Sequence, residues 1–258
     1  MIIKSDFFRF FKNKMNVFLL MVSSGIAILT FLVSWNSKRS VTIGLQNLLG
    51  TNGSYPTSIE NSMIEMLHAS DMVLLFMLYL IFSFWLSDFD NGRIKQLYLS
   101  SGNRVVIYIK KLVSIFSLTM LYYFMYLVAS FMISVSILGF NDSFSFIELL
   151  KAISFQILMI FLFLVILLQF IFILKNTHLI ITSLFMYPVV IQLIFILLKT
   201  IINENQLMKI AEFEPLTLFS NFGSTQTTNF GTVYLFVVLL TITFLYTGIF
   251  LFKKSELR

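Results

Sequence analysis

The sequence predicts an all-α, polytopic membrane protein with six transmembrane helices, and two observations lead to that prediction. The chain of 258 residues is 58% hydrophobic and only 12% charged, with a mean hydropathy of +0.92. A soluble domain carries about 25% charged residues, so this chain has too few charges to cover a globule of its size. Its apolar residues also fall in continuous runs, which favours helices over strands in a bilayer. Residues 1–258 are therefore expected to form a single transmembrane domain.

The predicted spans are apolar runs of the length needed to cross a hydrocarbon core of roughly 30 Å, which takes about 20 helical residues. None of the six apolar runs contains Asp, Glu, Lys, Arg or His, if the second run is taken to begin at Met72. Gln156, Gln169 and Gln192 lie inside spans, where such side chains typically form hydrogen bonds between helices. The spans are expected at residues 17–35, 70–87, 112–138, 153–174, 179–198 and 232–252.

The distribution of basic residues predicts the orientation. An even number of spans places both termini on one side, and that side holds thirteen of the 18 Lys and Arg residues, leaving five on the other. Because cytoplasmic loops are rich in Lys and Arg, both termini are expected in the cytoplasm. Membrane orientation also explains the net charge of +6, so no nucleic-acid partner is expected. The abundance of Phe, Ile, Lys and Asn suggests a bacterial source, and hence the bacterial cytoplasmic membrane.

Residues 2–15 have the pattern of an amphipathic helix lying on the cytoplasmic membrane surface. At 100° per residue, apolar side chains gather on one face and polar side chains on the other. A basic flank that only orients the first span is the simpler alternative, but four phenylalanines are more than orientation requires. The predicted interfacial residues are Phe7, Phe8, Phe10 and Phe11, and the predicted polar face holds Ser5, Asp6, Arg9, Lys12 and Asn13.

The loop 88–111, between the second and third spans, is expected to contain a short helix. Residues 90–92 are typical of a turn and helix start, and Ile94, Leu97 and Tyr98 then recur on one helical face. Residues 100–103 end this helix. Such a helix is suited to docking on a partner protein, and the alternative is that it lies on the lipid surface with its cations as membrane anchors. For Lys110 and Lys111, anchoring is the preferred interpretation.

This loop resembles that of type-2 ABC exporter permeases. In that family an acidic residue and a Gly-Thr pair precede a short helix that ends near Ser/Thr-Pro, and an Arg and then a Lys follow at the start of the third span. This sequence departs from the pattern at Arg93, which replaces Thr, and at Ser101, which replaces Pro. The matching positions are Asp90, Gly92, Leu97, Ser100, Arg104 and Lys111.

The resemblance extends along the chain, because family members have a similar length, an amphipathic N-terminal helix and six spans. They also have an external, partly re-entrant segment before the last span, here residues 203–231. The resemblance implies that the helix in loop 88–111 is a coupling helix, which fits a cleft on an ATPase. The residues expected to serve this coupling are Asp90, Gly92, Ile94, Leu97, Tyr98, Ser100 and Arg104.

The sequence contains no G-x-x-x-x-G-K-[ST], so it lacks a phosphate cradle of that type. The chain is therefore expected to be a transport subunit without catalytic residues, metal or bound cofactor of its own. ATP and Mg are then expected on a separate ABC ATPase subunit, present in two copies. The remaining implied partners are a second permease chain, identical or homologous, and membrane lipid.

Other function classes fit the sequence less well. An ion-coupled carrier normally keeps charged groups inside its spans, and an intramembrane protease needs a nucleophile or metal motif. A structural or sensory membrane subunit stays open as an alternative. Because the spans are apolar, the expected cargo is hydrophobic or amphipathic. A peptide or toxin of the bacteriocin-export type is preferred, and export of lipid or polysaccharide is the alternative.

Overall fold

The computed structural model describes residues 2–49, 72–139, 146–174 and 230–254, together with positions 59, 62, 63 and 67. All regular structure in this part of the chain is helical, which confirms the all-α class. Four helices are long and apolar enough to cross a membrane, and they coincide with four predicted spans. They run over Lys14–Leu32, Arg104–Leu138, Leu149–Ile173 and Gly231–Lys254.

The second predicted span is built differently. α4 (Met72–Leu80) continues into the π-helical turn η1 (Ile81–Leu86) and then into α5 (Ser87–Asp90). Val73–Phe89 and Arg93–Leu99, bent by 64° from each other, are together long and apolar enough to make a fifth span. The predicted fifth span at 179–198 and nearly all of the segment 203–231 lie outside the described residues, so the count of six spans stays a prediction.

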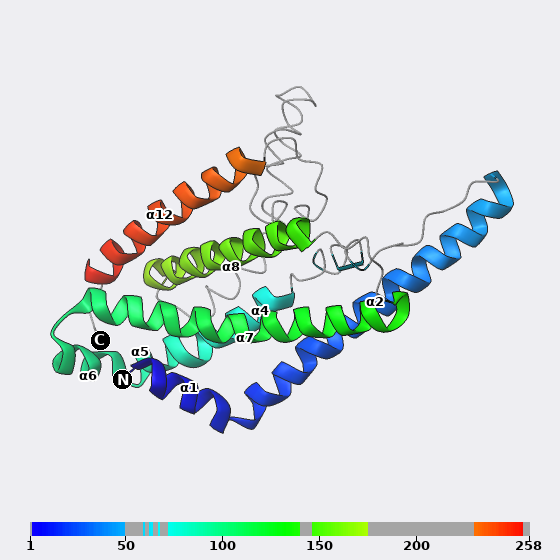
Figure 1. Ribbon diagram of the computed structural model, residues 1–258. Helices are drawn as coiled ribbons and strands as arrows, with labels where there is room; N and C mark the ends of the chain where they lie inside the picture. Colours follow the sequence, from blue (N-terminus) through cyan, green and yellow to red (C-terminus); the bar gives the residue numbers. More distant parts are fainter. Residues whose placement is uncertain are drawn as a thin grey trace.

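α7 (Arg104–Leu138) is the central helix. Figure 1 shows α1 (Ile2–Lys12) below it and α8 (Phe146–Leu174) and α12 (Phe230–Lys254) above it, while α2 (Lys14–Leu49) starts below α7 and rises past its far end. α4 and η1 also pack against α7. One face of α7 is buried over most of its length, and it carries four tyrosines among its buried side chains: Tyr108, Tyr122, Tyr123 and Tyr126. This face explains why so long a helix forms the middle of the bundle.

The N-terminal helix ends three residues earlier than predicted, because α1 stops at Lys12 and Asn13 caps α2. The Asn13 side chain accepts a hydrogen bond from the Met15 N–H at 3.0 Å, which satisfies a donor that the new helix leaves free. The buried residues of α1 are Ile2, Asp6 and Phe10, which recur every four residues. The predicted polar face is therefore wrong at Asp6, which points into the bundle.

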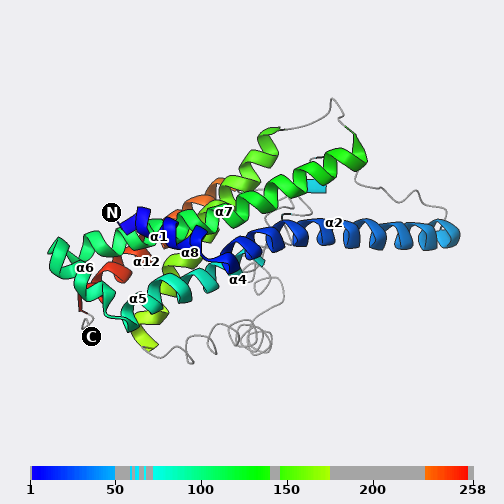
Figure 2. The same cartoon turned by 90° about the horizontal axis from the view of Figure 1, so that it is seen from below.

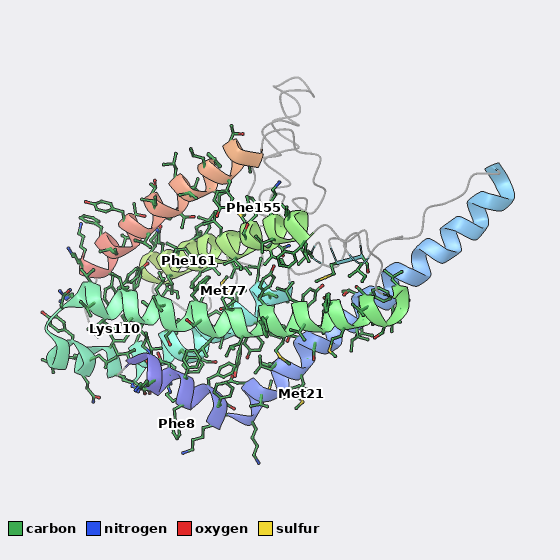
Figure 3. The ribbon with its side chains drawn as sticks, in the orientation of Figure 1. Phe8, Met21, Met77, Lys110, Phe155 and Phe161 are labelled. Carbon is green, nitrogen blue, oxygen red and sulfur yellow. The ribbon has the colours of Figure 1, made fainter. Side chains whose placement is uncertain are left out.

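The four phenylalanines of α1 do not share one environment. Phe8 and Phe11 are 69% and 55% exposed, and Figure 3 shows Phe8 pointing away from the bundle. Phe7 is partly buried against the core. Phe10 is fully buried, with its ring 5.8 Å from the ring of Tyr122. The prediction that Phe10 contacts lipid is wrong, because the ring fills the seam between α1 and α7; the interfacial position of the other three stays a prediction.

Two of the three predicted glutamine contacts between helices are present. The Gln156 amide on α8 donates to the carbonyl of Leu67 at 2.9 Å and accepts from the hydroxyl of Tyr123 on α7 at 2.7 Å. Gln169 donates to the carbonyl of Phe244 and, at 2.8 Å, to the hydroxyl of Thr247, both on α12. Gln192 lies outside the described residues. These bonds join α8 to α7 and to α12.

Several chain segments converge at one end of the bundle. In Figures 1 and 2, the start of α1, the short helix α6 (Arg93–Ser101), the start of α7 and the last turn of α12 all lie at the same end. The predicted coupling loop is therefore close to both ends of the described chain.

Candidate functional site

The predicted short helix in loop 88–111 is present as α6, and two glycines define its limits. Gly92 and Gly102 have φ of +65° and +66°, a left-handed conformation that side chains disfavour. The Gly102 N–H donates to the carbonyl of Tyr98 at 2.8 Å, which closes the last turn of α6. One residue later the Asn103 side chain accepts from the Val105 N–H and begins α7. The loop is thus a helix set between two sharp turns.

The apolar face of α6 points into the protein. Ile94 is 1% exposed, and Leu97 and Tyr98 pack against the core. The exposed side chains of the same helix are Lys95, Gln96 and Leu99, and Leu99 is 77% exposed. Ile94, Leu97 and Tyr98 were expected to serve coupling, and that role stays a prediction; the core covers Ile94, so Ile94 supports the helix from inside. Among the described side chains of α6, those most accessible to a partner are Lys95, Gln96 and Leu99.

Arg104 connects three helices at this end. It is the first residue of α7, and its guanidinium donates to the carbonyl of Lys253 in the last turn of α12 at 2.7 Å. The guanidinium also lies over the ring of Tyr98 on α6, 5.1 Å from the centroid. The final carbonyls of a helix lack partners within the helix, so an arginine is well placed to satisfy one. Arg104 therefore fixes the position of α6 relative to α7 and α12.

For two further residues of the predicted coupling set, Asp90 and Ser100, the structure describes the backbone but not the side chain. Asp90 is the last residue of α5, and Ser100 lies in the last turn of α6. The contacts of their side chains lie outside the described part of the structure.

A buried ionic cluster beside α6 was not predicted. The ammonium of Lys111 on α7 contacts both carboxylate oxygens of Asp6, at 2.9 and 3.0 Å, and also contacts Oδ2 of Asp88 on α5. The Ser114 hydroxyl donates to Asp6 at 3.1 Å. Lys111 and Asp6 are 1% exposed and Asp88 is 2% exposed. A charge this well buried requires opposite charges around it, and Lys111 has two.

The cluster extends from Asp88 to α1 and α6. Oδ1 of Asp88 lies 2.8 Å from the guanidinium of Arg9 on α1 and 3.6 Å from that of Arg93 on α6. Arg93 also donates to the hydroxyl of Ser5 at 2.7 Å, so α6 contacts α1 directly. We define the ionic cluster as Asp6, Arg9, Asp88, Arg93 and Lys111. It joins α1, α5, α6 and α7.

The prediction that Lys110 and Lys111 are both membrane anchors is wrong for Lys111. Lys110 is exposed, whereas Lys111 turns into the bundle. The spacing of residues along α7 does indicate that Lys111 is buried. Lys111 precedes the buried residues Ser114, Ile115 and Leu118 by three, four and seven positions, which places it on the same face of the helix. Asp6 likewise lies four residues from both Ile2 and Phe10.

An aromatic cluster lies next to the ionic cluster along the chain. The Trp85 ring of η1 is 5.7 Å from Tyr108, 5.9 Å from Phe172 and 6.1 Å from Phe252, measured between ring centroids. These rings come from α7, α8 and α12. α12 approaches closely here, because a Cβ on Gly248 would lie 2.5 Å from the Tyr108 hydroxyl oxygen. Packed aromatic rings therefore hold together the helices next to α6.

The arrangement at this end is suited to binding and to transmitting movement. Within the described ranges, no three His, Cys, Asp or Glu side chains are placed to hold a metal ion. What the site offers is an exposed helical surface attached through buried charges and rings to the long helices. A comparison of the chain with protein-family models, curated proteins and solved structures finds no match.

Proposed function

We propose that this chain is the transmembrane permease subunit of an ATP-driven exporter in a bacterial cytoplasmic membrane, with both termini and α6 on the cytoplasmic side. The observation that carries the proposal is α6 itself. This helix of nine residues buries Ile94 in the bundle and exposes Lys95, Gln96 and Leu99 on its outer side. A helix that is anchored on one face and exposed on the other suits docking on a soluble partner.

The attachments of α6 support a coupling role. A movement imposed on α6 reaches α12 through Arg104, and it reaches α1 through Arg93 and Ser5. It reaches the central helix through Asp88 and Lys111. Packed side chains and hydrogen-bonded or ionic networks of this kind can carry coupling between distant sites. α1, α7 and α12 are therefore all connected to the surface on which an ATPase would act.

The partners and the cargo follow from the same proposal. Two copies of a separate ABC ATPase subunit bind and hydrolyse ATP with Mg, and a second permease chain, identical or homologous, completes the pathway. The spans are apolar, so the cargo is a hydrophobic or amphipathic molecule, and a peptide or toxin is the preferred class. The chain itself carries out no catalysis.

The test is co-purification of the tagged full-length protein from its native host in mild detergent, followed by mass spectrometry. We expect a stoichiometric P-loop ATPase. The variant Lys95→Glu/Leu99→Asp changes only exposed side chains of α6, so it should stay in the membrane and lose the ATPase. Lys254→Glu changes an exposed residue at the same end of the molecule and should keep it.

Absence of an ATPase, even after crosslinking, would remove the transporter assignment and leave a structural or sensory subunit. An ATPase retained equally by all three proteins would instead show that α6 is not its docking site.

A further inference from the structure

The ionic cluster holds more positive than negative charge. Its cations are Arg9, Arg93 and Lys111, and its carboxylates are Asp6 and Asp88, so among the described ionic contacts three positive charges face two negative ones. Lys111 lies between both carboxylates. Arg9 and Arg93 share one oxygen, Oδ1 of Asp88, and Arg9 also lies 3.6 Å from Oδ1 of Asp6. The surplus charge therefore resides on the two arginines.

These two guanidiniums form the outer side of the cluster. The side chains of Arg9 and Arg93 are 32% and 34% exposed, whereas the other three members are at most 2% exposed. Each guanidinium has five N–H donors in a planar fork. Besides its contact with Asp88, Arg93 donates a hydrogen bond to the Ser5 hydroxyl. Besides its own contact with Asp88, Arg9 lies over the Phe84 ring and 3.6 Å from Asp6. Most donors of the pair are therefore available to an external acceptor.

The cluster also lies at the depth of lipid headgroups, if the apolar helices cross a bilayer. Asp88 is the first charged residue after the apolar run 72–87, and Lys111 is the last one before the run 112–138. The ends of apolar spans mark the boundary between hydrocarbon and headgroups. Phe8 and Phe11 are close to Arg9 in sequence and are exposed, so α1 offers apolar surface for an acyl chain in the same turn as Arg9.

We propose that Arg9 and Arg93 together bind the phosphate of an anionic phospholipid. Two adjacent guanidiniums bind phosphate through paired, charge-assisted hydrogen bonds, and the surplus positive charge selects a lipid with net negative charge. The bound lipid bridges α1 and α6 at the membrane surface. This proposal depends on the placement of the chain in a membrane and not on the exporter assignment.

The experiment is native mass spectrometry of the delipidated full-length protein with equimolar dioleoyl-phosphatidylglycerol and dioleoyl-phosphatidylcholine. We expect the wild-type protein to retain about ten times more phosphatidylglycerol than phosphatidylcholine. One additional charged hydrogen bond to the lipid is enough to give a preference of this size. Arg9→Gln/Arg93→Gln should lose this preference. Arg9→Lys/Arg93→Lys keeps both positive charges but removes the planar guanidinium groups, so it should lose part of the preference for phosphatidylglycerol. The control Lys110→Gln/Lys254→Gln removes two exposed cations and should keep it in full.

Three results would overturn the proposal. One is a wild-type protein without preference, and this result is decisive even if the glutamine variant does not fold. Another is an equal loss in the control variant, which would indicate general attraction between a basic surface and an acidic lipid. The third is displacement of the lipid by excess inorganic phosphate, which would identify the pair as a site for a free anion.

Discussion

The ammonium nitrogen of Lys111 on α7 lies 2.9 Å from Oδ2 of Asp6 on α1, and both side chains are 1% exposed. The two residues are 105 positions apart in the chain. Their contact attaches the N-terminal helix to the centre of the bundle by a charge pair that solvent does not screen. Removing one member leaves the other buried without a counter-charge, which makes the pair sensitive to single substitutions.

Lys111→Met should lower the free energy of unfolding by about 3–5 kcal/mol, because Asp6 and Asp88 lose their shared cation at nearly constant side-chain volume. Thermal unfolding in detergent measures the effect. Lys110→Met is the matched control, since Lys110 is adjacent but exposed. The double variant Asp6→Asn/Lys111→Met should recover part of the stability. Equal effects at Lys110 and Lys111 would show that the buried pair does not exist.

Gly248→Ala should destabilise the protein by about 1–3 kcal/mol, because the new methyl group would overlap the Tyr108 hydroxyl and push α12 away from α7. Tyr108→Phe removes that hydroxyl, which has no hydrogen-bond partner among the described residues, and should rescue Gly248→Ala. Gly231→Ala is the control on the same helix, since a Cβ there meets nothing within 4 Å. Additive effects in the double variant would contradict this contact.

Gln169→Leu should cost about 0.6 kcal/mol and at most about 1.7 kcal/mol, the range measured for hydrogen bonds between membrane helices. The substitution removes the bonds from α8 to Phe244 and Thr247 on α12. Thr247→Val removes one of the two acceptors, so the double variant should lose less than the sum of the single losses. A double-mutant cycle on unfolding midpoints gives this coupling, and a value of zero would exclude the bond to Thr247.

Ile94→Ala and Leu99→Ala separate the two faces of α6. Ile94 is 1% exposed, so its truncation should cost about 2–5 kcal/mol through the cavity that it leaves. Leu99 is 77% exposed, and its truncation should change stability by no more than about 0.5 kcal/mol. Unfolding of both variants in detergent makes the comparison, and a larger loss at Leu99 would reverse the orientation of the helix.

Much of the fold could be predicted from local sequence. Continuous apolar runs identified four of the long helices, and the glycines at 92 and 102 identified the limits of α6. These signals are local because hydrophobic length and left-handed turns depend on neighbouring residues. The face that α6 exposes was not predictable in this way. An apolar stripe shows which side is buried, but not whether the protein itself or another molecule covers it.

The ionic cluster could not be predicted because its members lie in different parts of the chain. Asp6 has the spacing of a buried residue, but an aspartate on a buried face makes sense only when its lysine is known. Lys111 follows a second lysine, and the pair together looks like an ordinary membrane anchor. Charge counts therefore predict an orientation but do not reveal the pairing.

The π-helical turn η1 determines the direction in which Asp88 points. In this turn the N–H of Ser87 bonds to the carbonyl of Phe82, five residues back, where an α-helix would bond four residues back. If the same residues formed α-helical bonds throughout, α5 would rotate by about 100° relative to α4, the angle that one residue adds in an α-helix. Asp88 would then turn away from Lys111, although the hydropathy of the span would not change. The wide turn, and not the hydropathy of residues 81–86, therefore sets the side of the bundle that Asp88 faces.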